Sequence, residues 1–193
     1  MPKTDPAREA LLTALEASGV SIPLWDGILI EETVRVAPGA TILPGCILRG
    51  NTTIAAGSVI GPGSVLTDAV IGKNCIVKNT YITESTLEEN VSIGPFSQVR
   101  PGCHIAAGCK IGDFVEVKNS HIGQKTAIAH LTYVGDTDCG SGVNFGCGVA
   151  IANFNGKEKF RTTIGDGAFL GCNTNLVAPV TIGAGAYTAA GAT

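Results

Sequence analysis

Large aliphatic residues recur along most of the chain at a spacing of six, with a few steps of five. The position after them is often glycine, and the position four after them holds a small side chain such as Ser58, Cys109 or Thr126. Neither the helical period of 3.6 nor the strand period of 2 fits these columns. The aliphatic column is Val36, Ile42, Leu48, Ile54, Ile60, Leu66, Ile71, Val77, Ile82, Leu87, Ile93, Val99, Ile105, Ile111, Val117, Ile122, Ile128, Val134, Cys139, Phe145, Ile151, Ile164, Leu170, Leu176, Ile182 and Thr188.

A six-residue unit with one large and one small inward side chain predicts a short strand followed by a corner. Repeats of a fixed short period are typical of solenoids. The 26 units resemble the hexapeptide β-helix family, which places three units in each coil. The resemblance implies a single-stranded left-handed parallel β-helix of about eight to nine coils, against the usual right-handed rule for parallel crossovers. A glycine-rich β-sandwich is the alternative interpretation of the same periodicity.

A short helix is predicted ahead of the repeats. Asp5 followed by Pro6 is typical of an N-cap and a first helical position, and Gly19 can end the helix. One face of this helix is apolar and consists of Leu11, Leu12 and Leu15. The helix is expected to cover the open first coil, because solenoids need a capped end. The predicted organisation is a capping helix and lead-in over 1–27 and a left-handed β-helix domain over 28–193.

Composition narrows the class of protein. Hydrophobic residues make up 45% of the chain but aromatic residues only 5%, and the net charge is −3. A negative balance does not favour nucleic acid as a partner, and no apolar stretch is long enough for a membrane span. The seven cysteines include no CxxC pair, so we expect free thiols and a cytoplasmic location. They are Cys46, Cys75, Cys103, Cys109, Cys139, Cys147 and Cys172.

The repeat is broken once, between Ile151 and Ile164, where the step is thirteen rather than six. The extra residues predict a loop over 152–163 that leaves the β-helix. This loop concentrates amide and basic side chains, namely Asn153, Asn155, Lys157, Lys159 and Arg161. Loops on a rigid scaffold often carry function, although a solvated surface loop is the plainer alternative.

Polar residues also gather on the coils just before this loop: Arg100, Glu116, Lys118, His130, Tyr133 and Asn144. His130 and Tyr133 interrupt an otherwise aliphatic and glycine-rich pattern. A single histidine on a β-structure is more often structural than catalytic, and exposed Arg and Lys are commonly ordinary surface charge. The pattern alone therefore leaves a catalytic and a structural interpretation open.

Five segments make a resemblance to one family specific: IGPFSQVRPG (93–102), IGDFVEVKNS (111–120), AHLTYVGD (129–136), VNFGCGVAIANFNGKEKFRTTIGD (143–166) and LVAPVTIGAGAYTAAG (176–191). They closely resemble the acetyltransferase half of the bacterial bifunctional enzymes that acetylate glucosamine-1-phosphate and then uridylylate the product. The resemblance implies acetyl transfer from acetyl-CoA, no metal requirement, and a homotrimer with the active site between subunits. No nucleotide-binding loop precedes the repeats, so no uridyltransferase activity is expected.

The resemblance also implies roles for single residues. His130 matches the general base, and imidazole suits this task because its ordinary pKa is about 6.5. Arg100, Lys118 and Lys159 match cations for the sugar phosphate, since Arg and Lys are strong phosphate ligands. Tyr133 and Asn144 match hydrogen-bonding partners of the substrate.

Acetyl-CoA contacts of the family map to Cys147, Asn153, Phe154, Cys172 and Ala190. Three of these positions depart from the family pattern, because Cys147 replaces Ala, Phe154 replaces Tyr and Cys172 replaces Ser. Contacts through the backbone survive such changes, whereas those made by a Tyr or Ser hydroxyl do not.

Three other functions remain open at this point. A γ-type carbonic anhydrase would need three His ligands for its metal, and His104, His121 and His130 lack that family's spacing. A non-catalytic β-helix module would keep the fold without the chemistry. The same chemistry on another phosphorylated or nucleotide-linked amino sugar would need no change in the residues named above.

Overall fold

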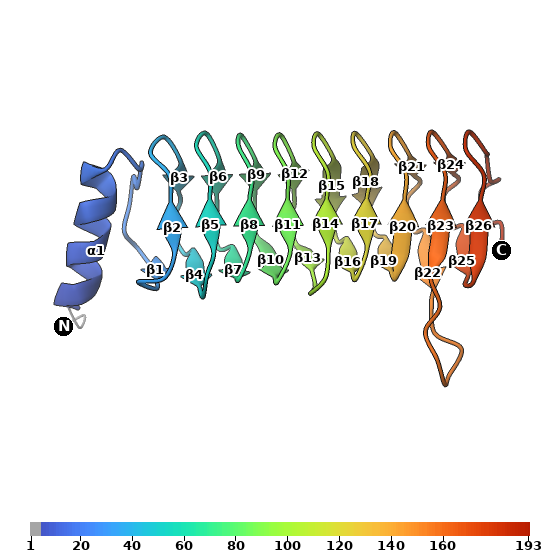
Figure 1. The fold of residues 1–193 in the computed structure, drawn as a ribbon, viewed down its shortest axis with the longest axis horizontal. Coiled ribbons are helices and arrows are strands. Elements are labelled where there is room, and N and C mark those ends of the chain that lie inside the picture. Colours follow the sequence, from blue (N-terminus) through green and yellow to red (C-terminus); the bar gives the residue numbers. More distant parts are fainter. Residues whose placement is uncertain (1–4) are drawn as a thin grey trace.

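A computed structural model describes residues 5–193, so the first four residues of the predicted lead-in lie outside the described residues. The described chain forms one helix followed by 26 short strands in three parallel sheets (Figure 1). Consecutive strands belong to different sheets, and every third strand pairs with its predecessor in the same sheet. This arrangement is a β-helix, and the predicted all-β, left-handed parallel fold with one short N-terminal helix is confirmed.

The first sheet consists of β1 (Leu29–Ile30), β4 (Ile47–Arg49), β7 (Val65–Thr67), β10 (Thr80–Thr83), β13 (Ser97–Val99), β16 (Glu116–Lys118), β19 (Tyr133–Gly135), β22 (Ala150–Ala152) and β25 (Asn175–Val177). The second sheet consists of β2 (Arg35–Val36), β5 (Thr53–Ile54), β8 (Val70–Ile71), β11 (Thr86–Leu87), β14 (His104–Ile105), β17 (His121–Ile122), β20 (Thr137–Cys139), β23 (Thr162–Ile164) and β26 (Val180–Ile182). The third sheet consists of β3 (Thr41–Ile42), β6 (Val59–Ile60), β9 (Ile76–Val77), β12 (Ser92–Ile93), β15 (Lys110–Asp113), β18 (Ala127–His130), β21 (Asn144–Phe145) and β24 (Phe169–Leu170).

The predicted aliphatic column forms the core. Leu66, Ile82, Val99, Val117 and Val134 pair in register along the first sheet and are all buried. Small residues fill the space between these stacks, and five of the seven cysteines are buried there. Burial raises the pKa of the Cys46 thiol to about 11 and that of Cys139 to about 12. The buried thiols are therefore uncharged packing groups at neutral pH.

The repeat differs from its predicted extent at both ends. Ile30, six residues before Val36, pairs with Leu48 in the first coil, so the aliphatic column starts one unit earlier than predicted, within the predicted domain 28–193. Thr188, the last predicted unit, lies outside any strand, and its hydroxyl lies 2.9 Å from that of Thr174. Because the described chain places no further coil over this end, residues there are more exposed than in the middle of the β-helix.

The helix α1 (Pro6–Ala17) lies at the first coil of the β-helix (Figure 1). Asp5 is its N-cap, as predicted, and accepts hydrogen bonds from the backbone N–H groups of Ala7 at 3.1 Å and Arg8 at 3.4 Å. The Arg8 Nε group donates to the Ile28 carbonyl at 2.7 Å. Leu12 is fully buried in the core, and Leu11 and Leu15 pack against it. The helix is too short and insufficiently apolar to cross a bilayer, and it is the one helix of the described residues.

We predict that Leu12→Ala lowers the free energy of unfolding by about 2–5 kcal/mol, because it leaves a cavity where the helix seals the core. The measurement is chemical denaturation followed by circular dichroism. Leu24→Ala is the matched control, since Leu24 is 58% exposed and its truncation should change stability by less than about 0.5 kcal/mol. Equal losses in the two variants would mean that the helix does not stabilise the β-helix.

Candidate active site

Polar side chains cluster on the outer face of the first sheet. Glu116 and Tyr133 are paired in register on β16 and β19, and Lys118 pairs with Gly135 at the ends of the same strands. Arg100 directly follows β13, and its Nη1 lies 2.9 Å from Glu116 Oε1. Side chains that alternate with the buried valines must point outward. The sheet therefore brings together three of the predicted substrate residues, Arg100, Lys118 and Tyr133.

A buried carboxylate, Asp136, organises this face. It lies in the corner after β19 and is only 5% exposed. Its oxygens accept hydrogen bonds of 2.5 Å from the side-chain amides of Asn119 and Asn153. The ammonium nitrogen of Lys118 lies 3.8 Å from Asp136 Oδ2. The amide of Asn153 also donates to the Tyr133 hydroxyl at 3.4 Å, so Asp136 connects four polar side chains across three coils.

Opposing effects act on the pKa of Asp136. Burial raises it, but hydrogen bonds from Asn119 and Asn153 and the positive charges of Lys118 and Lys159 lower it, and the net direction is downward. The carboxylate is therefore charged at neutral pH. A buried charge is costly unless it is paired and hydrogen-bonded. Asp136 can therefore be buried at this position only because these groups surround it.

Two lysines lie close together beside this carboxylate. Lys159 comes from the loop, and its contact with Lys118 is the largest cause of the lowered pKa of the Lys118 ammonium. Partial burial lowers that pKa further, whereas the charge of Asp136 raises it. Two neighbouring ammonium groups attract an anion with several oxygens, such as a phosphate.

His130 lies at the corner between the third and first sheets. It ends β18 and pairs with Asp113 at the end of β15, one coil earlier. The distance between His130 Nδ1 and Asp113 Oδ1 is 2.7 Å, and interaction with His130 lowers the pKa of Asp113. A carboxylate at Nδ1 favours the tautomer that carries the proton there, which leaves Nε2 as the free acceptor. His130 is exposed, so this nitrogen is accessible from solvent.

The same corner carries three of the predicted acetyl-CoA residues. Gly148 donates its N–H to the His130 carbonyl at 3.2 Å, and Asn173 donates to the Cys147 carbonyl at 2.8 Å. On the next coil Gly191 donates to the Cys172 carbonyl at 2.8 Å, which places Ala190 beside Cys172. Asp113, His130, Cys147, Cys172 and Ala190 are therefore stacked along one corner on successive coils.

The chain leaves the β-helix between β22 and β23, where the sequence predicts a loop over 152–163, and projects as a narrow hairpin (Figure 1). Phe154 and Lys159 form an antiparallel bridge, and Phe160 donates to the Asn153 carbonyl at 2.9 Å. Phe154 is 56% exposed on this hairpin. The side chain of Asn153, which is predicted to contact acetyl-CoA, donates hydrogen bonds to Asp136 and Tyr133. The loop residues Asn153 and Phe154 are thus separate from the corner of His130, Cys147 and Cys172.

The remaining candidates fall on other faces. Asn144 begins β21 on the third sheet and pairs with Ala127 and Phe169. His104 and His121 stack on the second sheet with ring centroids 4.9 Å apart. The structure therefore does not bring His104 and His121 together with His130, as a three-histidine metal site would require.

Sequence reasoning missed three residues of the site: Asp113, Asn119 and Asp136. Each is joined by a side-chain hydrogen bond to a residue 17 positions later, namely His130, Asp136 and Asn153. Seventeen residues is the length of one coil in this part of the chain. A search for polar pairs at this spacing would have found all three contacts from the sequence.

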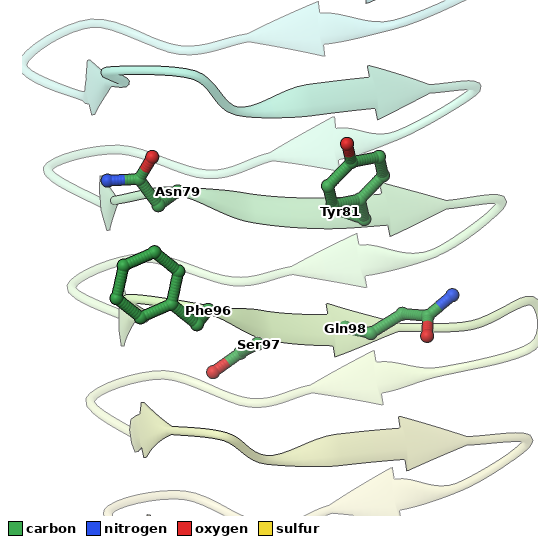
Figure 2. A pocket seen from close by; sticks show the side chains of 5 residues that line it. All are labelled: Asn79, Tyr81, Phe96, Ser97 and Gln98. Carbon is green, nitrogen blue, oxygen red and sulfur yellow. The ribbon is translucent and has the colours of Figure 1, made fainter.

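A shallow cavity of about 430 Å³ lies further toward the N-terminus on the first sheet. Figure 2 shows Tyr81 and Gln98 on adjacent strands, with Asn79 and Phe96 at the neighbouring corner. Gln98 pairs in register with Glu116, so this cavity adjoins the polar cluster. None of the predicted site residues lines it.

Comparisons with known proteins agree with the repeat. Residues 84–119 match the bacterial transferase hexapeptide family (six repeats). The chain is 45% identical over 186 residues to the bifunctional protein GlmU of Brevibacillus brevis and 46% identical to that of Acetivibrio thermocellus. Each match covers 96% of this chain and 40% of the relative. The chain thus spans about two fifths of the length of these relatives.

Solved structures show the same fold at low sequence identity. A UDP-N-acetylglucosamine acyltransferase from Francisella novicida has a TM-score of 0.53 at 15% identity, covering 77% of this chain and 60% of that one. The UDP-N-acetylglucosamine O-acyltransferase (LpxA) of Moraxella catarrhalis has a TM-score of 0.52 at 18% identity, covering 83% and 65%. At such identities the likeness concerns the fold alone.

The lowered pKa of Asp136 predicts a pH-dependent contribution to stability. At pH 7, Asp136→Asn should lower the free energy of unfolding by about 1–3 kcal/mol, because the amide donors of Asn119 and Asn153 lose their charged acceptor. A carboxylate with a lowered folded-state pKa stabilises the protein above the unfolded pKa of about 3.9 and loses this effect as pH falls through its folded pKa. Thermal unfolding of both forms should show a gap that stays constant from pH 7 to about pH 4 and narrows below it.

The control is Asp26→Asn, a substitution of an exposed carboxylate, which should change the unfolding temperature little at either pH. A gap between the wild type and Asp136→Asn that stays constant or widens below about pH 4 would contradict the lowered pKa of Asp136.

Proposed function

The chain belongs to the hexapeptide-repeat family and resembles the GlmU proteins over almost its whole length, and from this we propose that it is an acetyl-CoA-dependent acetyltransferase. The acceptor is the 2-amine of glucosamine-1-phosphate, and the product, N-acetylglucosamine-1-phosphate, serves UDP-N-acetylglucosamine and cell-wall precursor synthesis. Residues 28–193 form the acyltransferase domain in this proposal. The observation that carries it is the Asp113–His130 pair, which lies at the corner that also holds Cys147 and Cys172. Strand β19 leads from this corner to the polar cluster around Asp136.

His130 is the general base in this mechanism. The amine of the sugar attacks the thioester carbonyl only in its neutral form, so a proton must leave nitrogen as the new C–N bond forms. His130 accepts this proton at Nε2, because Nδ1 donates its own proton to Asp113. Asp113 then stabilises the imidazolium by its negative charge. Collapse of the intermediate breaks the C–S bond, and the imidazolium gives its proton to the departing thiolate, which leaves as the thiol of CoA.

The corner supplies donors for the developing oxyanion. Within the described residues, the backbone N–H groups of Cys147 and Cys172 have no hydrogen-bond partner, although both belong to turns in the stack that contains His130. Such free N–H groups can polarise the thioester oxygen as charge accumulates on it. Contacts through N–H groups do not depend on the side chain, which supports roles for Cys147, Cys172 and Ala190 in binding acetyl-CoA. Because Asn153 and Phe154 are separate from this corner within one chain, they approach acetyl-CoA from the loop of a neighbouring subunit in this proposal.

Arg100, Lys118 and Lys159 bind the phosphate of the acceptor, and Tyr133 and Asn144 bind its sugar. Support comes from the adjacent ammonium groups of Lys118 and Lys159, whose mutual repulsion would be relieved by a phosphate. Arg100 is held on the same face by Glu116 at 2.9 Å. Acetyl-CoA is a co-substrate in this scheme, and no step calls for a metal.

We further propose a cytoplasmic homotrimer. Phe96, Phe114 and Leu131 occupy successive corners with left-handed φ values of 58°, 55° and 49°, and each is more than half exposed. The rings of Phe96 and Phe114 stack with centroids 5.6 Å apart. Bulky residues with positive φ are unfavourable, and an exposed apolar ridge is typical of a contact surface. Both features support a subunit contact beside His130.

A second acceptor class is favoured by the cavity lined by Tyr81, Phe96 and Gln98 (Figure 2). Two aromatic side chains beside the phosphate-binding face would suit the base of a nucleotide-linked amino sugar. The test is release of CoA thiol from acetyl-CoA with a panel of amino sugars. Glucosamine-1-phosphate should be the best acceptor, whereas preference for a nucleotide-linked sugar would favour the second class. Absence of turnover by the folded protein with every member would leave a non-catalytic module.

We predict that His130→Ala lowers kcat by roughly 10²–10⁴, the usual contribution of a positioned base. Since His130 is exposed, its truncation should leave the unfolding temperature and both substrate affinities nearly unchanged. Equal turnover by variant and wild type, under conditions where chemistry limits the rate, would exclude His130 as the base. Glu116 would then be the next candidate to test.

A separate prediction concerns the phosphate. Lys118→Ala or Arg100→Ala should weaken binding of the sugar phosphate by about tenfold or more, since charge-assisted hydrogen bonds are worth about 1.5–3 kcal/mol. Binding of acetyl-CoA should be nearly unaffected. Calorimetric titration of each substrate measures both constants. A comparable loss for the two substrates would mean that these cations belong to another ligand.

A further inference from the structure

The hairpin 153–161 is attached to the β-helix at its two ends, each time through a carboxylate. At its start, Asn153 donates its side-chain amide to Asp136. At its end, Arg161 binds Asp138, which lies on β20 two residues after Asp136. The two carboxylates therefore lie next to each other on one coil and face the two ends of the loop.

The contact at the end of the loop is a bidentate ion pair. Arg161 Nε donates to Asp138 Oδ2 at 2.8 Å, and Nη2 donates to Oδ1 at 2.5 Å. The third donor, Nη1, lies 3.1 Å from the Asn119 carbonyl. Asn119 in turn donates its side chain to Asp136, so this one residue links both attachments. A planar guanidinium in such a fork fixes direction as well as distance.

Between its two ends the hairpin is bonded only to itself. In the described chain, the hydrogen bonds of residues 154–160 stay within 153–160: Asn155 N–H donates to the Glu158 carbonyl, and the Asn155 side chain accepts from Lys157 and Glu158. The place of Lys159 relative to the β-helix is consequently set by the two attachments. Yet Lys159 is near enough to Lys118 to lower the pKa of its ammonium, and free like charges would move apart.

We propose that Asp138 and Arg161 are positioning residues that hold the Lys159 ammonium beside Lys118 and so complete the acceptor's phosphate site. This inference rests on the proposed function and extends it to residues outside the site described above. In this proposal Asp138 and Arg161 act through Lys159 and not by contact with a substrate. Their effect is to restrict where the loop can place Lys159, which the repulsion between the two ammonium groups would otherwise displace.

The structural test is hydrogen–deuterium exchange of the hairpin amides in the full chain. Arg161→Ala and Asp138→Asn should each increase exchange in residues 154–160 without changing the core strands. The charge exchange Asp138→Arg with Arg161→Asp should restore protection in part. The matched control is Arg49→Ala, since Arg49 lies 3.9 Å from Glu31 in another exposed ion pair, near the start of the β-helix. Unchanged exchange of the hairpin in Arg161→Ala would overturn the proposal.

The functional test separates KM from kcat. Arg161→Ala should raise KM for glucosamine-1-phosphate by up to about fivefold, the range expected for an exposed ion pair, and leave KM for acetyl-CoA and kcat nearly unchanged. In a Lys159→Ala background the same substitution should add no further increase, because the residue that Arg161 positions is absent. An equal increase in both backgrounds would overturn the positioning role.

The two hypotheses fail in different ways. A wild-type protein that acetylates no amino sugar would contradict the proposed function, while hydrogen exchange and calorimetric binding of glucosamine-1-phosphate would still test the Arg161 contact. A wild type that turns over normally, together with Arg161→Ala that binds the sugar phosphate equally well, would overturn the positioning role alone.

Discussion

In-register pairing of successive coils is the constraint on which the rest of this structure depends. Each backbone segment finds its hydrogen-bond partner one coil away, so a residue's neighbour along the axis is fixed by the length of the coil. Three contacts of the site follow directly from a coil of 17 residues: Asp113 with His130, Asn119 with Asp136, and Asp136 with Asn153. A site built this way needs no long-range folding event beyond the stacking that also forms the core.

The same stacking explains how the chain maintains unfavourable electrostatics on one face. Lys118 and Lys159 repel each other, and Asp136 is almost completely removed from water. Neither group would be stable alone, since a buried charge needs partners. Together they are stable, because the negative charge of Asp136 offsets part of the repulsion between the two ammonium groups. Two side-chain amides hydrogen-bond to the oxygens of the carboxylate. The residual positive charge remains directed outward, where a phosphate can meet it.

The six-residue period predicted the fold, the core and the site of the loop from the sequence, because each depends on local alternation. The hexad pattern did not predict the contacts that depend on the length of a whole coil. Asp113 and Asp136 occupy unremarkable positions within their own units and acquire partners only through stacking. Asn153 was assigned by resemblance to acetyl-CoA, yet its side chain is committed to Asp136 and Tyr133. A loop residue's partners depend on how the loop returns to the scaffold, which periodicity does not describe.

The two substrates of the proposed reaction would be recognised by different parts of the chain, and this explains where the sequence tolerates change. On the acceptor side, charged side chains such as Lys118 perform the recognition, so a substitution removes it. At the corner the available groups are backbone N–H donors, which Cys147 and Cys172 present as well as Ala or Ser would. The coil stack holds those donors in place regardless of side chain. Phe154 differs, because no backbone group can substitute for the hydroxyl of the Tyr that the family has at this position. The presence of Phe instead of Tyr should therefore weaken the binding of CoA and leave the chemistry at His130 unchanged.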